Sequence, residues 1–156
     1  VVTDQRFLAI SSASESWLSE PLEFDEADSA ALLTGEAVVI LVTDKRFLGF
    51  GGTENRFVEV AFEIGENVVA EGAGQNFGVV VTSTRAIGFA SKTGNYTEIP
   101  LETGDTFHSL EMAATLALVH AENNIYVYRA ATDAWSMRKQ PLYLLYIIFF
   151  LGVIYL

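Results

Sequence analysis

The stretch VTDQRFLAI at residues 2–10 recurs along the chain with small changes. It returns as VTDKRFLGF at 42–50, as VTSTRAIGF at 81–89 and, more altered, as VHAENNIYV at 119–127. Aligning the copies on their arginine places Arg6, Arg46, Arg85 and then Asn123 in register, with a period of about 40 residues. A period of this length, kept over four copies, predicts a repeat architecture.

Each repeat contains more than these nine residues. An aromatic residue follows each arginine by eleven positions, as Trp17, Phe57 and Tyr96, and Trp135 is its counterpart in the fourth copy. The third copy displays four short segments rich in β-branched and aromatic residues, at 67–73, 77–82, 85–90 and 95–100. Glycine and asparagine mark the joints between them. The repeat therefore predicts four antiparallel strands, with TDKR or TSTR as the tight turn between the second and the third.

Such a unit resembles the blade of a β-propeller, and the resemblance covers residues 1–138. Four copies imply an all-β, small, four-bladed propeller. A β-trefoil, which uses three units of this length, is the alternative, and the Thr-x-x-Arg hairpin is also similar to one strand pair of bacterial pleckstrin-homology-like domains. The first copy begins inside its second strand and lacks the first. Residues upstream of Val1 or a partner would complete it, or the first blade is short.

The composition excludes several classes of function. The chain carries 20 acidic and 9 basic residues, a net charge of −11, and such a chain repels nucleic-acid phosphates. It contains no cysteine, which excludes disulfides, thiolate metal sites and cysteine nucleophiles. We therefore expect no nucleic-acid partner.

The last sixteen residues, PLYLLYIIFFLGVIYL at 141–156, carry no charge. A helix of this length spans about 24 Å, slightly less than the hydrocarbon core of about 30 Å, and Arg138 and Lys139 could extend it by snorkelling. Tyr143, Tyr146 and Tyr155 suit the two membrane interfaces. The sequence predicts a repeat domain at 1–138 and a C-terminal transmembrane helix at 139–156. A buried core helix is the alternative.

The sequence contains no recognisable set of catalytic, metal-binding or cofactor-binding residues. His108 and Glu111, with Glu71 or Glu36, have the right residue types for a metal, but their spacing matches no ligand motif, and a polar channel lining is favoured. His120 is interpreted as a turn residue that replaces the threonine of the hairpin. The glycine-rich stretches at 51–55 and 71–78 are interpreted as turns. We expect no catalytic residue, no metal and no cofactor, and hence no enzyme.

The aromatic column of Trp17, Phe57, Tyr96 and Trp135 allows two interpretations. It could form a sugar-binding ring, or each member could anchor the outermost strand of its repeat to the neighbouring repeat. The second is favoured, because a residue repeated at a fixed strand position is first a packing requirement.

These features predict a non-enzymatic, membrane-anchored scaffold or accessory subunit of a larger membrane complex, photosynthetic or respiratory. Its partners would be integral membrane protein subunits and the lipid bilayer. The first alternative is a membrane-tethered ligand-binding or lectin-like sensor, and the second is a metal-assisted hydrolase that uses channel carboxylates.

An up-down-up-down repeat places the turns between second and third strands on the same edge as the end of the fourth strand. This edge would then form a membrane-proximal basic face, attracted to anionic headgroups. The tendency of cationic residues to stay on the cytoplasmic side places the domain in the cytoplasm. The residues of the face are Arg6, Lys45, Arg46, Arg85, Arg138 and Lys139.

Overall fold

The computed structural model describes residues 1–11, 16–51 and 55–140 of the chain, which form antiparallel sheets joined by short connections. In chain order the elements are β1 (Arg6–Ala9), β2 (Leu18–Pro21), α1 (Glu26–Ser29), β3 (Ala31–Thr34), β4 (Val38–Val42), β5 (Arg46–Gly51), β6 (Arg56–Ala61), β7 (Val68–Ala73), β8 (Phe77–Thr82), β9 (Arg85–Ala90), β10 (Asn95–Pro100), β11 (Phe107–Met112), β12 (Leu116–Ala121), β13 (Asn124–Arg129) and β14 (Ala134–Lys139).

The strands form four successive sheets. Sheet 1 contains β1 and β2, sheet 2 contains β3 to β6, sheet 3 contains β7 to β10 and sheet 4 contains β11 to β14. In each four-stranded sheet the strands pair in chain order. The four segments predicted in the third copy correspond to β7, β8, β9 and β10 within one residue, which confirms the four-stranded repeat.

Sheet 1 holds only the third and fourth strands of its repeat. Val2 forms an isolated bridge with Phe7, and the backbone of Val1 exchanges two hydrogen bonds of 2.8 Å with that of Leu8. Val1 and Val2 therefore lie where the second strand runs in the other sheets. The described part of the first repeat is incomplete, as the sequence predicts.

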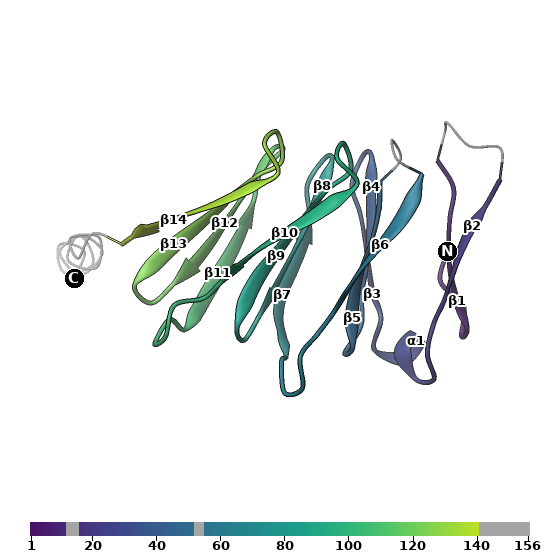
Figure 1. Cartoon of the computed structure of the whole chain (residues 1–156), viewed down its shortest axis with the longest axis horizontal. Helices are drawn as coiled ribbons and strands as arrows, with labels where there is room; N and C mark the ends of the chain where they lie inside the picture. The colour runs from purple at the N-terminus through teal and green to yellow at the C-terminus, as the bar shows by residue number, and fades with distance from the viewer. Residues whose placement is uncertain (12–15, 52–54, 141–156) are drawn as a thin grey trace, which may run out of the picture.

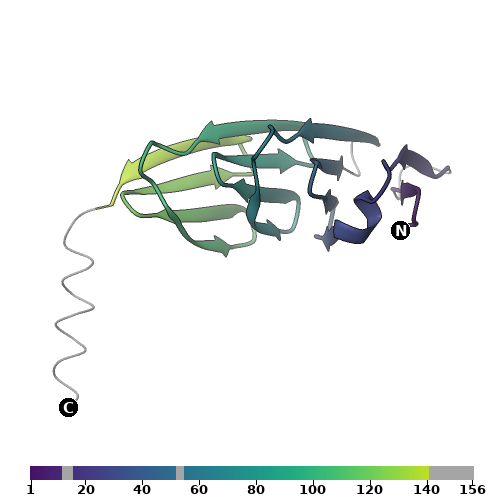
Figure 2. The same ribbon diagram turned by 90° about the horizontal axis from the view of Figure 1, so that it is seen from below.

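The four sheets stand in a row, with sheet 1 at one end and sheet 4 at the other (Figure 1). Figure 2 shows the same row from below, with the outermost strands along one side. The described residues do not close a ring, because sheet 1 and sheet 4 do not meet. The predicted all-β, propeller-like fold of four successive repeats is thus confirmed, and the described residues form an open row of four sheets.

The hairpin register also corrects the alignment of the fourth repeat. His120 pairs with Ile125 as Val42 pairs with Phe47, so His120 occupies the position of a valine. Asn124, rather than Asn123, takes the place of the arginines, and the aromatic residue then follows it by eleven positions, as in the other copies. Backbone pairing decides which residues are equivalent. The alignment based on sequence similarity is therefore shifted by one residue in the fourth repeat.

The position of the hairpin threonine changes in the fourth repeat as a result. Ala121, rather than His120, replaces Thr43 and Thr82. His120 is thus a strand residue of β12, and its interpretation as a turn residue is wrong.

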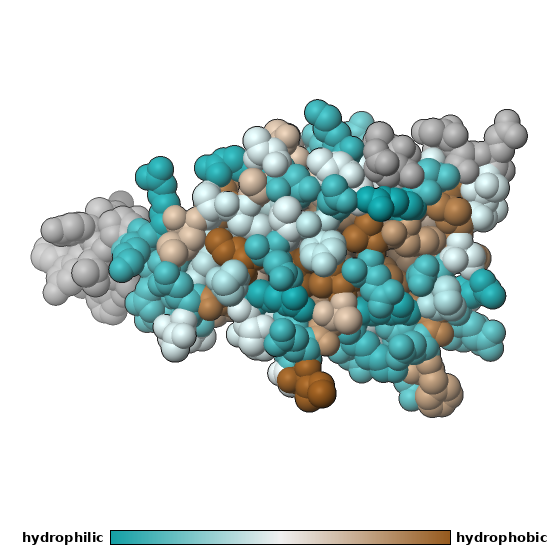
Figure 3. All heavy atoms as spheres, viewed as in Figure 1, coloured by the Kyte–Doolittle hydropathy of each residue, from teal (hydrophilic) through white to brown (hydrophobic). Residues whose placement is uncertain are grey.

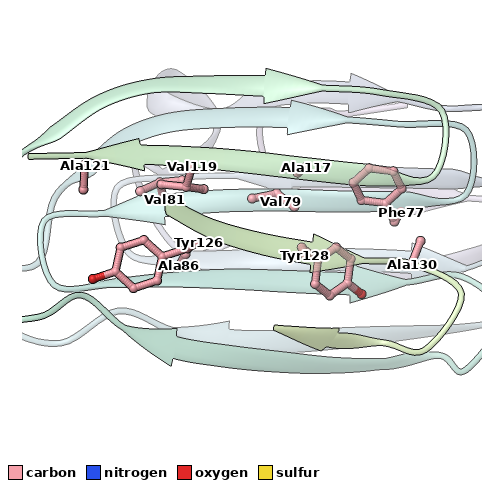
Figure 4. Close-up of a cluster of buried hydrophobic side chains, with 10 residues drawn as sticks. All are labelled: Phe77, Val79, Val81, Ala86, Ala117, Val119, Ala121, Tyr126, Tyr128 and Ala130. Carbon is pink, nitrogen blue, oxygen red and sulfur yellow. The ribbon is translucent and has the colours of Figure 1, made fainter. Parts of the chain in front are cut away.

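The hydrophobic core lies between neighbouring sheets. The largest cluster packs the face of sheet 3 that includes Phe77 and Val79 against the face of sheet 4 that includes Tyr126 and Tyr128 (Figure 4). A second cluster lies between sheets 2 and 3, and a third, around Phe7, lies between sheets 1 and 2. Each inner sheet therefore buries both of its faces, and strands such as β5 and β8 are buried at every position.

Two glycines set the spacing of these interfaces. A methyl group on Gly49 would come within 2.8 Å of the ring of Phe89 in the next sheet, and one on Gly88 within 2.4 Å of the ring of Tyr128. Phe89 and Tyr128 occupy equivalent positions in β9 and β13. The absence of a side chain at each glycine thus lets an aromatic ring of the following sheet pack directly against the backbone.

The first prediction concerns this contact. Replacing Gly88 by Ala should destabilise the fold by about 1–3 kcal/mol, because the rigid ring of Tyr128 has to move. Urea unfolding of the chain in mild detergent would measure the loss. The matched control is Val127→Ala at the equivalent position of β13, where no described sheet follows; its cost should be below 1 kcal/mol. Equal effects of the two changes would refute the role of the glycine.

The C-terminal anchor, predicted at 139–156, lies mostly outside the described residues. Arg138 and Lys139 belong to β14. The segment 141–156, with Tyr143, Tyr146 and Tyr155, is not described. Within residues 1–11, 16–51 and 55–140 there is no helix of sufficient length and apolarity to cross a membrane.

Candidate functional site

Polar connections gather along one edge of the row, which we call the lower edge because it lies at the bottom of Figure 1. It consists of the connections between sheets, residues 22–30, 62–67 and 101–106, and of the turns between second and third strands. The arginine or asparagine that begins the third strand of a repeat lies directly after this turn. The lower edge is therefore where the repeated hairpin and the link to the preceding sheet meet.

Glu26, in the connection between sheets 1 and 2, is fully buried and receives a set of hydrogen bonds. Arg46 donates from Nε to Oε1 at 2.9 Å and from Nη2 to Oε2 at 2.7 Å, a bidentate pair. The hydroxyl of Thr43 donates to Oε1 at 3.0 Å, and the backbone N–H of Glu23 donates to Oε2 at 2.7 Å. The Thr-x-x-Arg turn thus holds the carboxylate of the connection that precedes its sheet.

The next repeat builds the same arrangement. Glu66 receives Nε and Nη2 of Arg85 at 2.9 and 3.0 Å, the hydroxyl of Thr82 at 2.6 Å and the backbone N–H of Glu63 at 2.7 Å. The side chain of Glu66 is 1% exposed. Two buried ion pairs, one per repeat, therefore fix two connections by the same contacts.

Each arginine also reaches the sheet before its own. Nη2 of Arg46 donates to the backbone carbonyl of Pro21 at 2.8 Å, at the end of β2, and Nη2 of Arg85 donates to that of Ala61 at 2.9 Å, at the end of β6. Within their own sheets, Nη1 of Arg46 lies 3.2 Å from Glu59 and Nη1 of Arg85 lies 2.6 Å from Glu98. The guanidinium groups thus tie neighbouring sheets together at this edge.

The ion pairs keep both carboxyl groups ionised despite their burial. Burial by itself would raise the pKa of Glu26, but the hydrogen bonds from Arg46, from the backbone of Glu23 and from Thr43 outweigh it and lower the pKa to about 2. Glu66 follows the same pattern, and its pKa is also lowered to about 2. The pKa values of Arg46 and Arg85 are raised, mainly by their hydrogen bonds to these glutamates.

The fourth repeat replaces the ion pair by neutral donors. Asp105 accepts Nδ2 of Asn124 at 2.7 Å, the backbone N–H of Asn123 at 2.9 Å and the hydroxyl of Tyr126. Burial, followed by this hydrogen bond to Asp105, raises the pKa of Tyr126 to about 12. The backbone N–H of Glu102 in turn donates to the tyrosine oxygen at 2.8 Å. An acidic residue of the connection is again held by the hairpin, without arginine.

The structure brings the six residues of the predicted basic face to the lower edge. Arg46 and Arg85 are paired there as described. Arg6 donates to Ser19 at 2.7 Å, and Lys45 donates to Glu23 at 3.2 Å and to the carbonyl of Phe24 at 3.0 Å. Arg138 and Lys139 lie beside Ile125 and Asn124, at the start of β13.

Acidic residues outnumber basic ones at this edge. Its connections and turns hold one lysine, Lys45, and the carboxylates of Asp4, Glu23, Asp25, Glu26, Asp28, Asp44, Glu63, Glu66, Glu102, Asp105 and Glu122. A shallow hollow of about 380 Å³ between sheets 1 and 2 is lined by Asp4, Glu23, Asp25 and Asp28 together with apolar Leu22 and Phe24. The lower edge is therefore acidic, and the basic residues lie within it.

Two large apolar side chains extend from this acidic edge. Phe24 is 86% exposed and Ile64 is fully exposed. They occupy the same place in successive connections, EFDE at 23–26 and EIGE at 63–66, directly after the residue whose backbone N–H binds the buried glutamate. Figure 3 shows apolar groups projecting separately along the lower border of a largely hydrophilic face.

The residues considered for a metal are separated. His108 Nε2 lies 2.8 Å from Glu122, and His120 Nε2 lies 3.4 Å from Glu111. The described part of the chain contains no group of three or more potential metal ligands.

The aromatic column serves packing where the structure describes its contacts. Phe57 packs against Phe7 of the preceding sheet, with ring centroids 5.1 Å apart. Trp135 packs on Tyr128 and donates from Nε1 to the carbonyl of Thr97 in sheet 3 at 3.1 Å. This supports the anchoring interpretation at Phe57 and Trp135 and leaves the sugar-ring alternative without support at these two positions, whereas Trp17 and Tyr96 are exposed.

Glu26, Glu66 and Asp105 did not emerge from the sequence as site residues. A signal was present, because each stands three positions after a glutamate and 19 or 20 positions before the arginine, or asparagine, that binds it. This spacing was hard to recognise because the connection and the hairpin are far apart in sequence and because exposed acidic residues are abundant.

The second prediction follows from the depressed pKa values. Between about pH 4.5 and 2 the unfolded chain binds protons at these two glutamates that the folded chain does not. Stability conferred by ionised Glu26 and Glu66 is therefore complete above about pH 4.5 and is lost as the pH falls toward 2, by roughly 3 kcal/mol for each group. Urea unfolding as a function of pH would measure it.

The matched variants for this measurement are Glu26→Gln and Glu36→Gln. The first should flatten the acid slope and lower stability at neutral pH, because Arg46 loses its buried partner. The second removes an exposed carboxylate at the opposite edge, so it should change neither the acid slope nor the stability at neutral pH. An unaltered acid slope in Glu26→Gln would contradict the assignment.

The fold has counterparts among solved structures. A fragment of HIRA matches with a TM-score of 0.51 at 11% identity, covering 75% of this chain and 40% of its own. The N-terminal domain of Nup159 gives 0.45 at 16% identity, covering 90% and 42%, and Hsv2 of Kluyveromyces lactis gives 0.39 at 10%, covering 74% and 38%. The chain thus spans about two fifths of each matched structure.

Neither a protein-family model nor a curated protein matches the chain. The structural match to HIRA and the repeated four-stranded antiparallel sheets define the class of the protein. It is a β-propeller repeat protein, and its described residues form a partial ring of blades.

Proposed function

We propose that the chain is a non-enzymatic protein-interaction scaffold that is held at a membrane by residues 141–156 and binds its partner through the lower edge. The observation that carries this proposal is the pair of apolar side chains, Phe24 and Ile64, presented at equivalent positions on connections that buried ion pairs hold in place. Exposed apolar residues on a fixed backbone form interaction hot spots at little conformational cost.

The negative charge around Phe24 and Ile64 favours a positively charged partner. Carboxylates surround both of them, and the guanidinium groups of Arg46 and Arg85 are occupied by Glu26 and Glu66. An anionic bilayer would be repelled by such an edge. A basic protein segment with apolar side chains is complementary to it.

Basic segments with apolar side chains occur in the loops of integral membrane proteins. Cytoplasmic loops of integral membrane proteins are enriched in lysine and arginine. β14 ends at the lower edge, so an anchor that follows it would bring this edge close to the bilayer and to those loops. The proposed role is therefore that of an accessory subunit on the cytoplasmic side of a membrane complex; a respiratory or photosynthetic host would provide such a setting.

The third prediction tests the binding surface. A peptide of alternating lysine and leucine residues in an amphipathic helical pattern should bind the chain, and salt should weaken the binding. The double change Phe24→Ser with Ile64→Ser should weaken it by about ten-fold or more, because two apolar anchors are lost. Fluorescence anisotropy of the labelled peptide would measure the dissociation constant.

A matched control removes two apolar side chains that lie in strands, by Leu32→Ser with Tyr96→Ser. Their exposed fractions are 44% and 42%, and binding should stay within about two-fold of the parent. Equal losses for both double variants would show that the apolar contribution to binding is not confined to Phe24 and Ile64, and the lower edge would then not be the binding surface.

The fourth prediction tests the membrane anchor. The whole chain should float with zwitterionic vesicles in a density gradient, whereas a chain ending at residue 140 should stay at the bottom and keep its β-rich circular dichroism. Flotation of both chains would place the membrane contact elsewhere. Unfolding of the shortened chain would show that 141–156 is part of the hydrophobic core.

A further inference from the structure

The fourth repeat lacks the guanidinium group that the second and third repeats place at the lower edge. In those repeats the arginine bridges three groups: the buried glutamate of the connection, the backbone carbonyl at the end of the preceding sheet, and a glutamate in the outermost strand of its own sheet. Asn124 stands in the place of the arginine, and its amide nitrogen contacts only the carboxylates of the connection. The lower edge between sheets 3 and 4 is therefore incomplete by comparison with its two counterparts.

The acceptors that an arginine would bind are nevertheless present between sheets 3 and 4. Pro100 ends β10 as Pro21 ends β2 and Ala61 ends β6, and no described side chain donates to the carbonyl of Pro100. The connection that follows carries the carboxylates of Glu102 and Asp105. Pro100 and Glu102 are exposed and Asp105 is half-buried, so a ligand can reach them from solvent.

None of the nine basic residues of the chain neutralises these carboxylates. All nine lie in the part of the chain that the structure describes, and none of them forms an ion pair with Glu102 or Asp105. Lys139 lies opposite Asn124 in β14 and is exposed, and it is not paired with either carboxylate. Two negative charges are thus held here by neutral donors, whereas Glu26 and Glu66 are each paired with an arginine.

The buried amide of Asn124 is a second, independent sign that a donor is missing. Asn124 is 1% exposed, and its Nδ2 lies between the two carboxylates, 2.7 Å from Asp105 and 3.1 Å from Glu102. Its Oδ1 is buried and has no hydrogen-bond donor among the described residues. A buried acceptor without a donor is unfavourable, so this site favours a ligand that brings several N–H groups.

We propose that an arginine side chain of the basic partner segment binds at the lower edge between sheets 3 and 4, where its guanidinium group replaces the one that the fourth repeat lacks. It donates to the carboxylates of Glu102 and Asp105 and to the carbonyl of Pro100, as Arg85 donates to its acceptors one repeat earlier. A guanidinium group suits these acceptors because it is planar, always charged and carries five N–H donors. The inference rests on the proposed function and adds the chemistry of one contact of the partner.

The site can be tested without a partner, with N-acetyl-arginine amide as the probe. In the nitrogen-15-labelled whole chain in mild detergent, the backbone N–H signals of Asp105 and Asn123 should shift and saturate, because both groups donate within this connection. The expected dissociation constant is about 1–10 mM. N-acetyl-citrulline amide, which has the same shape without the charge, should cause no saturable shift. The N–H signals of Glu23 and Glu63 should not move, because their connections already hold an arginine.

Three variants separate this site from a general attraction of cations. Glu102→Gln removes one exposed acceptor and should weaken probe binding about three- to five-fold. Glu36→Gln removes the same charge at the opposite edge and should leave the dissociation constant unchanged. Asp105→Glu with Asn124→Arg restores the residues of the second and third repeats and should abolish probe binding, because the chain then fills the site itself. If this double variant does not fold, the exposed Glu102→Gln still decides.

A peptide measurement distinguishes an arginine of the partner from a free guanidinium compound. The amphipathic peptide of the third prediction, with arginine in place of every lysine, should bind about three-fold more tightly than its lysine form. Glu102→Gln should remove this difference, because it removes an acceptor of the guanidinium group.

Equal binding of the two peptides would overturn the inference while leaving the proposed function intact. The absence of saturable shifts with N-acetyl-arginine amide, or equal effects of Glu102→Gln and Glu36→Gln on probe binding, would overturn it as well. If neither peptide binds, the proposed function fails and the partner's arginine fails with it, whereas the probe still shows whether the chain has a guanidinium site.

Discussion

A sheet whose two faces are both apolar is stable only between two neighbours. β5 and β8, buried at all positions, show how completely this constraint governs the inner sheets. It explains why the core is distributed over three interfaces instead of forming one centre. It also explains why the repeat recurs at nearly constant length, because each unit has to present a forward face that fits the backward face of the next.

Polar contacts at the lower edge complement this packing. Hydrophobic contacts between flat sheets leave the lateral position poorly determined, whereas a bidentate guanidinium–carboxylate pair has a strict geometry. Arg46 joins its own turn, the glutamate of the connection and the last strand of the preceding sheet. Removing either partner would leave a buried charge unpaired, which is why both members recur together in the second and third sheets. The fourth sheet reaches a similar result with Asp105, Asn124 and Tyr126, so the requirement is for a held connection and not for a particular charge.

The same connections can present side chains for recognition because the buried ion pairs hold them in place. Glu23 and Glu63 donate backbone hydrogen bonds to the buried glutamates, and the next residue in each case is the exposed Phe24 or Ile64. An apolar side chain on a fixed backbone loses little entropy when it binds. The surrounding carboxylates are the reason why the proposed partner is a basic segment. The proposal of a protein-interaction scaffold therefore rests on a local feature of this edge.

The sequence by itself determined the four-stranded unit, because alternating apolar residues and turn signals are local. It located β7 to β10 within one residue and placed the basic residues on one edge through the direction of successive strands. It did not determine that Asn124 is the equivalent of the arginines, since hairpin register depends on backbone pairing. It also missed the pairing of Glu26 with Arg46 and of Glu66 with Arg85, because these partners are 20 and 19 residues apart and meet only when one sheet packs on the next. The packing of neighbouring sheets was likewise decided by tertiary structure: the close approach of Gly49 and Gly88 to aromatic rings of the following sheet joins residues about 40 positions apart, which no local pattern records.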